Sequence, residues 1–248
     1  MQIYGLIGNP LGHSLSEKYF TDKFTSNHIE ASYKLFPLES IDDLPALIHS
    51  TNDLAGLNVT IPYKTAAIHH IQHIDKDARM VGAINTIKIE KRNSRQVLTG
   101  YNTDIYGFEQ CIRPFIQAKH IVKALILGTG GAAKAVQFVL RKMGIGYTLV
   151  SRNGLKVGQL PYSLVTSSVI KTHLIIINAT PIGMFPNVDA KPDILYQYIG
   201  SDHILIDLIY NPEETLFMKI GRMAGAQTIN GMVMFEKQAE ESWRIWNK

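Results

Sequence analysis

The 248-residue sequence has few cysteines, a modest share of charge and no long apolar run. Cys111 is the only cysteine, so the chain cannot form an internal disulfide, and we expect it to work in the cytoplasm. The absence of any run of about 18 apolar residues excludes a typical membrane-spanning helix. The opening residues, MQIYGLIGNP, lack the basic and apolar segments of a signal peptide, so none is expected.

Charged residues make up 19% of the sequence, and the net charge of +4 is small. The basic residues are scattered and form no stripe, so we expect no binding to nucleic acid. The histidines offer no convincing metal site, because His69 and His73 are four residues apart but no third ligand is evident. The 46% share of hydrophobic residues is that of a globular protein with one large or two small domains.

The chain is organised around residues 123–152, which read KALILGTGGAAKAVQFVLRKMGIGYTLVSR. The apolar run at 124–127 is typical of a strand buried in a parallel sheet, and residues 135–143 place apolar side chains at helical spacing. A second apolar run at 147–150 predicts the next strand. A strand, a glycine turn, a helix and a strand are the setting in which G-x-G-x-x-A indicates a dinucleotide site.

Each small residue of this turn has a physical role. Gly128 permits the tight turn, Gly130 lets the backbone approach a pyrophosphate, and Ala133 lets the helix pack closely on the sheet. The N-terminus of the helix offers N–H groups and a partial positive charge to phosphates. Arg152 ends the second strand, where an NAD site usually has an acidic residue, so we expect NADP. The plainer interpretation is a glycine-rich turn followed by a surface arginine.

Strands and helices also alternate along the rest of the chain, which predicts an α/β fold. A hairpin is predicted from the strands at 85–89 and 96–98, and at most one helix is expected between residues 153 and 172. The only plausible domain seam lies near residues 100–102. Further strands are predicted at 3–7, 31–36, 55–59, 174–177, 203–208 and 227–229, and helices at 15–27, 41–49, from 60 onward, 102–116, 215–223 and 232–246.

Polar side chains follow several predicted strands, where open α/β sheets bind ligands. Ser14 and Ser16 offer two hydroxyls beside a helix start and suit a carboxylate, although one of them could simply cap the helix. Lys64 is predicted in the first helical turn after an N-cap at Thr60, where the helix dipole disfavours a cation, which suggests a specific task. The plainer interpretations are a solvated lysine and, for Asp104, a helix cap.

Taken together, eight segments in the same order make the chain resemble the shikimate dehydrogenase family over nearly its whole length. Two features depart from that family. Glu17 stands where the family usually has proline after the second serine, and the stretch 153–172 is short. The matching segments are residues 8–16, 58–64, 82–86, 100–104, 128–133, 178–184, 207–215 and 231–239.

The resemblance implies an oxidoreductase that reversibly reduces 3-dehydroshikimate to shikimate with NADPH, in the chorismate route to aromatic amino acids. It implies two αβ domains with a cleft between them: a substrate-binding domain of residues 1–101 plus 231–248, and a Rossmann-type NADP domain of residues 102–230. Lys64 and Asp104 would be the catalytic pair. Substrate would be bound by Ser14, Ser16, Thr60, Asn85, Tyr210 and Gln238. The cofactor would be bound by Gly128, Gly130, Gly131, Ala132, Ala133, Ser151, Arg152, Thr180 and Gly231.

Other interpretations stay open on the sequence. One is an enzyme of the same fold that prefers quinate or uses NAD, and another is a cofactor-binding regulatory module without catalysis. The two serines and Arg152 favour shikimate and NADP, and the presence of both Lys64 and Asp104 argues against the regulatory module. The chain is expected to act on a small molecule as a monomer or homodimer.

Overall fold

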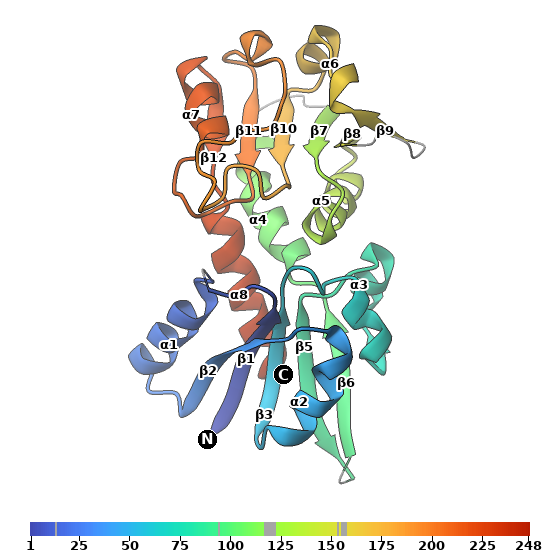
Figure 1. The fold of residues 1–248 in the computed structure, drawn as a ribbon, viewed down its shortest axis with the longest axis vertical. Helices are drawn as coiled ribbons and strands as arrows, with labels where there is room; N and C mark the ends of the chain where they lie inside the picture. The colour runs from blue at the N-terminus through green and yellow to red at the C-terminus, as the bar shows by residue number, and fades with distance from the viewer. Residues whose placement is uncertain (13, 94, 117–122, 153, 155–157) are drawn as a thin grey trace. The chain divides into compact units, whose positions relative to one another are not determined.

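The computed structural model describes residues 1–12, 14–93, 95–116, 123–152, 154 and 158–248, in two compact units (Figure 1). Unit 1 contains Met1–Thr103 and Gln238–Lys248, and unit 2 contains Asp104–Lys237. Each unit has its own sheet with helices between the strands, so the predicted α/β fold is confirmed. Among the described residues, every helix is too short or too polar to cross a lipid bilayer.

Unit 1 contains strands β1 (Gln2–Gly8), β2 (Ala31–Pro37), β3 (Leu54–Val59), β4 (His73–Ile74), β5 (Thr86–Arg92) and β6 (Arg95–Tyr101). Their order in the sheet is β2-β1-β3-β5-β6-β4. The first three strands are parallel, and β5 and β6 form the predicted antiparallel hairpin. The helices are α1 (Ser16–Ser26), η1 (Ile41–Asp43), α2 (Leu44–Ser50), η2 (Ala66–His70) and α3 (Lys76–Val81).

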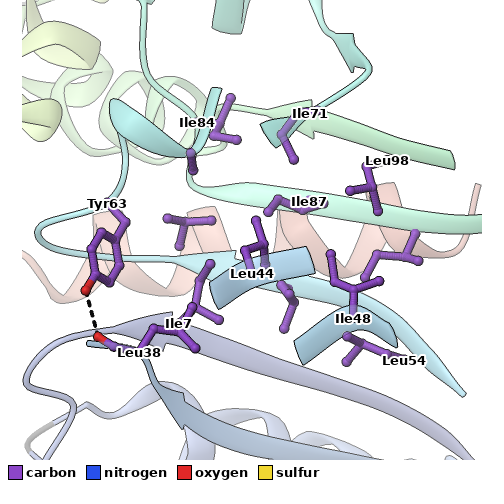
Figure 2. Packing of buried hydrophobic residues seen from close by; sticks show 14 of the residues in the cluster. Ile7, Leu38, Leu44, Ile48, Leu54, Tyr63, Ile71, Ile84, Ile87 and Leu98 are labelled. Atoms are coloured by element: carbon purple, nitrogen blue, oxygen red, sulfur yellow. Dashed lines mark hydrogen bonds between the residues drawn. The ribbon is translucent and has the colours of Figure 1, made fainter. Parts of the chain in front are cut away.

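One face of this sheet is covered by α2 and buries aliphatic side chains (Figure 2). Full burial of one such side chain stabilises the fold by about 1.5–3 kcal/mol. The Tyr63 hydroxyl donates to the Leu38 carbonyl at 2.6 Å and closes the edge of the cluster. The side chains that meet here include Ile7, Leu44, Ile48, Leu57 and Ile87.

Aromatic rings cover the other part of the unit 1 core. Tyr4 stacks on Trp246 with ring centroids 4.7 Å apart, and Phe20 and Trp243 pack against the same group. Both tryptophans come from helix α8 (Met232–Trp246). The Trp246 indole N–H donates to the carbonyl of Ile87 at 3.0 Å. The last part of α8 is therefore held on the unit 1 sheet by ring packing and a buried hydrogen bond.

Unit 2 contains β7 (Lys123–Leu127), β8 (Gly146–Ser151), β9 (Gln159–Pro161), β10 (Ile175–Asn178), β11 (Ile204–Asp207) and β12 (Gln227–Ile229). They are all parallel, in the order β12-β11-β10-β7-β8-β9. This is the doubly wound dinucleotide-binding order, which reverses between β7 and β10. The helices are α4 (Asp104–Ile116), α5 (Gly131–Lys142), η3 (Tyr162–Leu164), α6 (Ser167–Thr172), η4 (Tyr196–Tyr198) and α7 (Leu216–Met223).

The helix predicted from Thr60 is wrong. The chain forms a turn after β3, and a 3₁₀ helix begins only at Ala66. Tertiary hydrogen bonds explain the difference: the Thr60 N–H donates to Ile7 at 2.9 Å, and the Lys64 carbonyl accepts from Ile84 at 2.8 Å. Lys64 therefore does not lie in the first turn of a helix, and the dipole argument for a task at Lys64 no longer holds.

Three short elements, β4, α3 and β9, are not predicted by the sequence patterns. Each has six residues or fewer, which is too short for a clear apolar period. Between residues 153 and 172, where at most one helix was expected, the described residues contain the α-helix α6 and also the 3₁₀ helix η3. Residues 153 and 155–157 of that stretch lie outside the described part of the chain.

Candidate active site

The carboxyl ends of β1 and β3 present the first group of predicted residues. Ser14 follows β1, and its hydroxyl oxygen accepts from the backbone N–H of Ser16 at 3.2 Å. Ser16 is buried at the start of α1. Thr60 follows β3, which pairs with β1 through Ile7 and Val59. Because the two strands are parallel neighbours, the hydroxyls that follow them lie at the same edge of the unit 1 sheet.

Asn85 and Gln238 are brought together within unit 1. The Asn85 side-chain oxygen accepts from the backbone N–H of Thr103 at 2.7 Å. Its amide nitrogen lies 3.0 Å from the Thr103 hydroxyl and 3.4 Å from Gln238 Oε1. Asn85 comes from the start of the hairpin and Gln238 from α8, 153 residues later. Thr103 connects them, a role that sequence patterns do not indicate.

Lys64 and Asp104, the predicted catalytic pair, belong to different compact units. Lys64 is half-buried in the turn after β3. Asp104 begins α4 and is only 4% exposed. A carboxylate at that depth is costly unless polar groups compensate it, so Asp104 is not an ordinary solvated helix cap. The pairing of these two groups stays a prediction.

The glycine turn lies at the point where the strand order of unit 2 reverses. Gly128 has φ +108, and a Cβ there would lie 2.9 Å from Thr180 Cγ2 and 3.0 Å from the Ala179 carbonyl. Gly130 is the N-cap of α5 and makes no side-chain cap. The helix therefore presents backbone N–H groups at its N-terminus, and Ala133 is fully buried behind them. These features fit a bound dinucleotide pyrophosphate.

The end of β8 carries Arg152, whose side chain is exposed. Ser151 is engaged locally: its hydroxyl donates to Gln159 at 3.1 Å and accepts from the N–H of Gly154 at 2.9 Å. Burial raises the pKa of the Tyr162 phenol, and the nearby Arg152 charge opposes that rise. Arg152 thus stands at the strand end where a ribose substituent is expected.

A buried carboxylate organises the loops after β10 and β11. Asp207 accepts from the Thr215 hydroxyl at 2.6 Å, the Ile209 N–H at 3.0 Å and the Asn178 amide at 3.1 Å. The Asn178 side-chain oxygen accepts from the Thr180 hydroxyl at 2.6 Å. Asp207 thereby fixes the loop that carries Thr180. Sequence patterns place Asp207 at the end of a strand but do not show its burial.

Tyr210 and Gly231 are held near each other in unit 2. The Gly231 N–H donates to the Ile209 carbonyl at 2.9 Å, and a Cβ on Gly231 would collide with the Leu208 carbonyl. The Tyr210 ring lies 5.0 Å from the ring of Phe235, and burial raises the pKa of its phenol. Tyr210 is therefore held by packing, with a neutral hydroxyl. Over the part of the chain that the structure describes, no group of three metal-ligating side chains occurs.

Asp207 leads to a prediction about pH and stability. Burial raises its pKa to about 6, against the hydrogen bonds that lower it. An unfolded aspartate has a pKa of about 3.9, so the stability that the protonated form provides is complete below that value. It is lost as the pH rises through 6. Between about pH 4 and pH 7, the free energy of unfolding of the wild type, measured with urea, should fall by up to about 3 kcal/mol relative to that of the Asp207→Asn variant. If the difference in unfolding free energy between the two proteins did not change with pH, the raised pKa of Asp207 would be contradicted.

Comparisons with known proteins extend over the whole chain. Residues 6–87 match the family described as the shikimate dehydrogenase substrate binding domain. A curated relative from Clostridium beijerinckii, shikimate dehydrogenase (NADP(+)), is 39% identical over 257 residues, which cover 100% of this chain and 93% of the relative. The crystal structure of shikimate dehydrogenase 1 from Peptoclostridium difficile is 36% identical, with a TM-score of 0.86, and the match covers 100% of this chain and 92% of that one. The Thermus thermophilus shikimate 5-dehydrogenase in complex with NADP(H) and shikimate is 27% identical, with a TM-score of 0.83 and coverage of 99% and 93%.

Proposed function

This chain belongs to the shikimate dehydrogenase family, and we propose that it reversibly reduces 3-dehydroshikimate to shikimate with NADPH, in aromatic amino acid biosynthesis. The observation that carries the proposal is the glycine turn at the reversal of the unit 2 strand order, with an open helix N-terminus behind it. Relatives named for NADP(+) favour this cofactor over NAD and do not favour the quinate or regulatory alternatives. The single cysteine, which is buried, is consistent with a cytoplasmic setting. We treat the assembly as a monomer or homodimer.

The substrate-binding domain in this proposal is residues 1–101 plus 231–248. Ser14 and Ser16 bind the substrate carboxylate, because hydroxyls at a helix start donate to an anion. Thr60, Asn85 and Gln238 bind the ring hydroxyls, and the proposal is supported by the contact between the Asn85 and Gln238 amides and by the place of Thr60 directly after β3. Tyr210, held by packing on Phe235, is the further substrate-binding residue of the proposal.

The NADP-binding domain is residues 102–230. The turn at 128–133 binds the pyrophosphate. Thr180 contacts the cofactor from the loop after β10, the strand that pairs with β7. Gly231 lies at the nicotinamide. Arg152 binds the 2′-phosphate through charge-assisted hydrogen bonds, and its exposure leaves it accessible to that group. NADPH supplies the hydride of the reaction.

Lys64 supplies the proton. As the ring ketone is reduced, negative charge develops on the carbonyl oxygen, and the Lys64 ammonium donates a proton to that oxygen. Asp104 orients the ammonium and stabilises its charge. A positioned proton donor accelerates such a step by about 10² to 10⁴. In the reverse direction the neutral lysine amine removes the proton from the substrate hydroxyl.

The proposal is tested by mixing the purified protein with shikimate and NADP⁺ and following NADPH absorbance. We expect turnover, with kcat/KM at least about tenfold higher for NADP⁺ than for NAD⁺, since about 1.4 kcal/mol from one charge-assisted contact suffices. Arg152→Ala should remove the preference, whereas Arg141→Ala, another exposed arginine of unit 2, should keep it. No turnover would overturn the function, and equal efficiency with both cofactors would overturn the role of Arg152.

A second prediction concerns Ser14 and Ser16. Ser14→Ala or Ser16→Ala should raise KM for shikimate by about tenfold or more, because a hydrogen bond to a charged group contributes about 1.5–3 kcal/mol. kcat should change less. Ser26→Ala, an exposed serine at the end of the same helix, is the matched control. If both variants kept the wild-type KM while folding normally, the carboxylate must bind elsewhere.

A further inference from the structure

Ser242 is a fully buried serine at the centre of a cluster of polar side chains in unit 1, whose other members are Asn58, Asn85, Thr86, Thr103 and Gln238. Its oxygen lies 3.0 Å from the Asn58 amide nitrogen, 2.8 Å from the Thr86 hydroxyl and 3.1 Å from the Thr103 hydroxyl. It donates to the Gln238 carbonyl one turn earlier in α8, at 2.9 Å. A hydroxyl has one proton and two lone pairs, so with its proton on the Gln238 carbonyl it can accept from two of the other three neighbours at a time, and its hydrogen-bonding capacity is filled. Ser242 thus joins α8 to β3, β5 and the end of the hairpin.

The surrounding contacts fix which end of each amide faces which way. The Tyr33 hydroxyl donates to Asn58 Oδ1 at 2.8 Å, which turns the Asn58 nitrogen toward Ser242. The backbone N–H of Thr103 can only donate, so Asn85 Oδ1 is its acceptor and the Asn85 nitrogen faces Gln238 Oε1. That leaves the nitrogen end of the Gln238 amide as its donor for a ligand oxygen.

We propose that Ser242 is a positioning residue for substrate binding: it ties α8 to the sheet and thereby orients the amides of Asn85 and Gln238. This inference rests on the proposed function. The Ser242 hydroxyl contacts Thr86 and Thr103, and these hydroxyls in turn contact the amides of Asn85 and Gln238, so Ser242 acts on the two amides indirectly. Without its hydroxyl, α8 loses its polar attachment to β3 and β5 one turn after Gln238. The loss should weaken binding of the substrate and leave binding of the cofactor unchanged, because each of these groups belongs to unit 1.

The test is steady-state kinetics with shikimate and NADP⁺ on the full chain. Ser242→Ala should raise KM for shikimate about three- to tenfold, the equivalent of one neutral hydrogen bond, and leave KM for NADP⁺ within about twofold. Thr86→Val, which keeps the side-chain shape and removes the shortest contact to Ser242, should show the same split. Added to Gln238→Ala, the Ser242→Ala change should have less effect than it has alone, because it acts through that amide.

Ser32→Ala is the matched control, since the Ser32 hydroxyl is buried in the same unit without a hydrogen-bond partner among the described residues. It should keep both KM values. The inference alone is overturned if Ser242→Ala matches Ser32→Ala in KM for shikimate. It is equally overturned if both KM values rise together with a lower melting temperature, which would show a purely structural role. A wild-type protein without shikimate turnover would overturn the proposed function and the inference with it.

Discussion

Replacing Lys64 by alanine is expected to lower kcat by about 10² or more while KM for shikimate changes less, because the proton is needed chiefly in the transition state. The fold should tolerate the change. The backbone at Lys64 is held by its carbonyl, which accepts from the Ile84 N–H at 2.8 Å and does not depend on the side chain. Steady-state kinetics, with thermal melting as the check of folding, measures the effect.

Two controls sharpen the Lys64 experiment. Lys76→Ala removes an exposed lysine at the start of α3 in the same unit and should leave kcat unchanged. A small primary amine such as ethylamine, added to Lys64→Ala, should restore part of the lost rate by acting as the proton donor. A folded Lys64→Ala protein that turns over near the wild-type rate would remove Lys64 from the mechanism.

Asp104→Asn should also lower kcat, by about 10², because the amide keeps the shape of the carboxylate and loses its charge. Asp104 is buried at the start of α4, so water cannot take over the role of the lost negative charge. The double variant with Lys64→Ala should be much less impaired than the product of the single effects, because residues that act as a unit are not additive. Kinetics on the four proteins completes the cycle. Multiplicative effects would mean that the two residues work independently.

Local patterns determined much of the fold. The run of residues 123–152 predicted β7, α5 and β8, and the predicted hairpin is present as β5 and β6. The terminal helix was predicted at 232–246 and begins and ends at those residues. Such features depend on side-chain period and turn residues, which neighbouring positions in the chain supply. The family was likewise recognisable from short motifs in a fixed order, and the whole-chain comparisons confirm it.

Tertiary contacts decided the rest. The turn that holds Lys64 replaced a predicted helix, because Ile84 and Ile7 supply its hydrogen bonds from other parts of the chain. The strand order of unit 2, which brings Gly128 against Thr180, joins segments about fifty residues apart in the sequence. Burial likewise arises only when distant elements pack. It makes Asp207 a carboxyl with a raised pKa and Ser242 a fully enclosed hydroxyl, and no local pattern encodes either state.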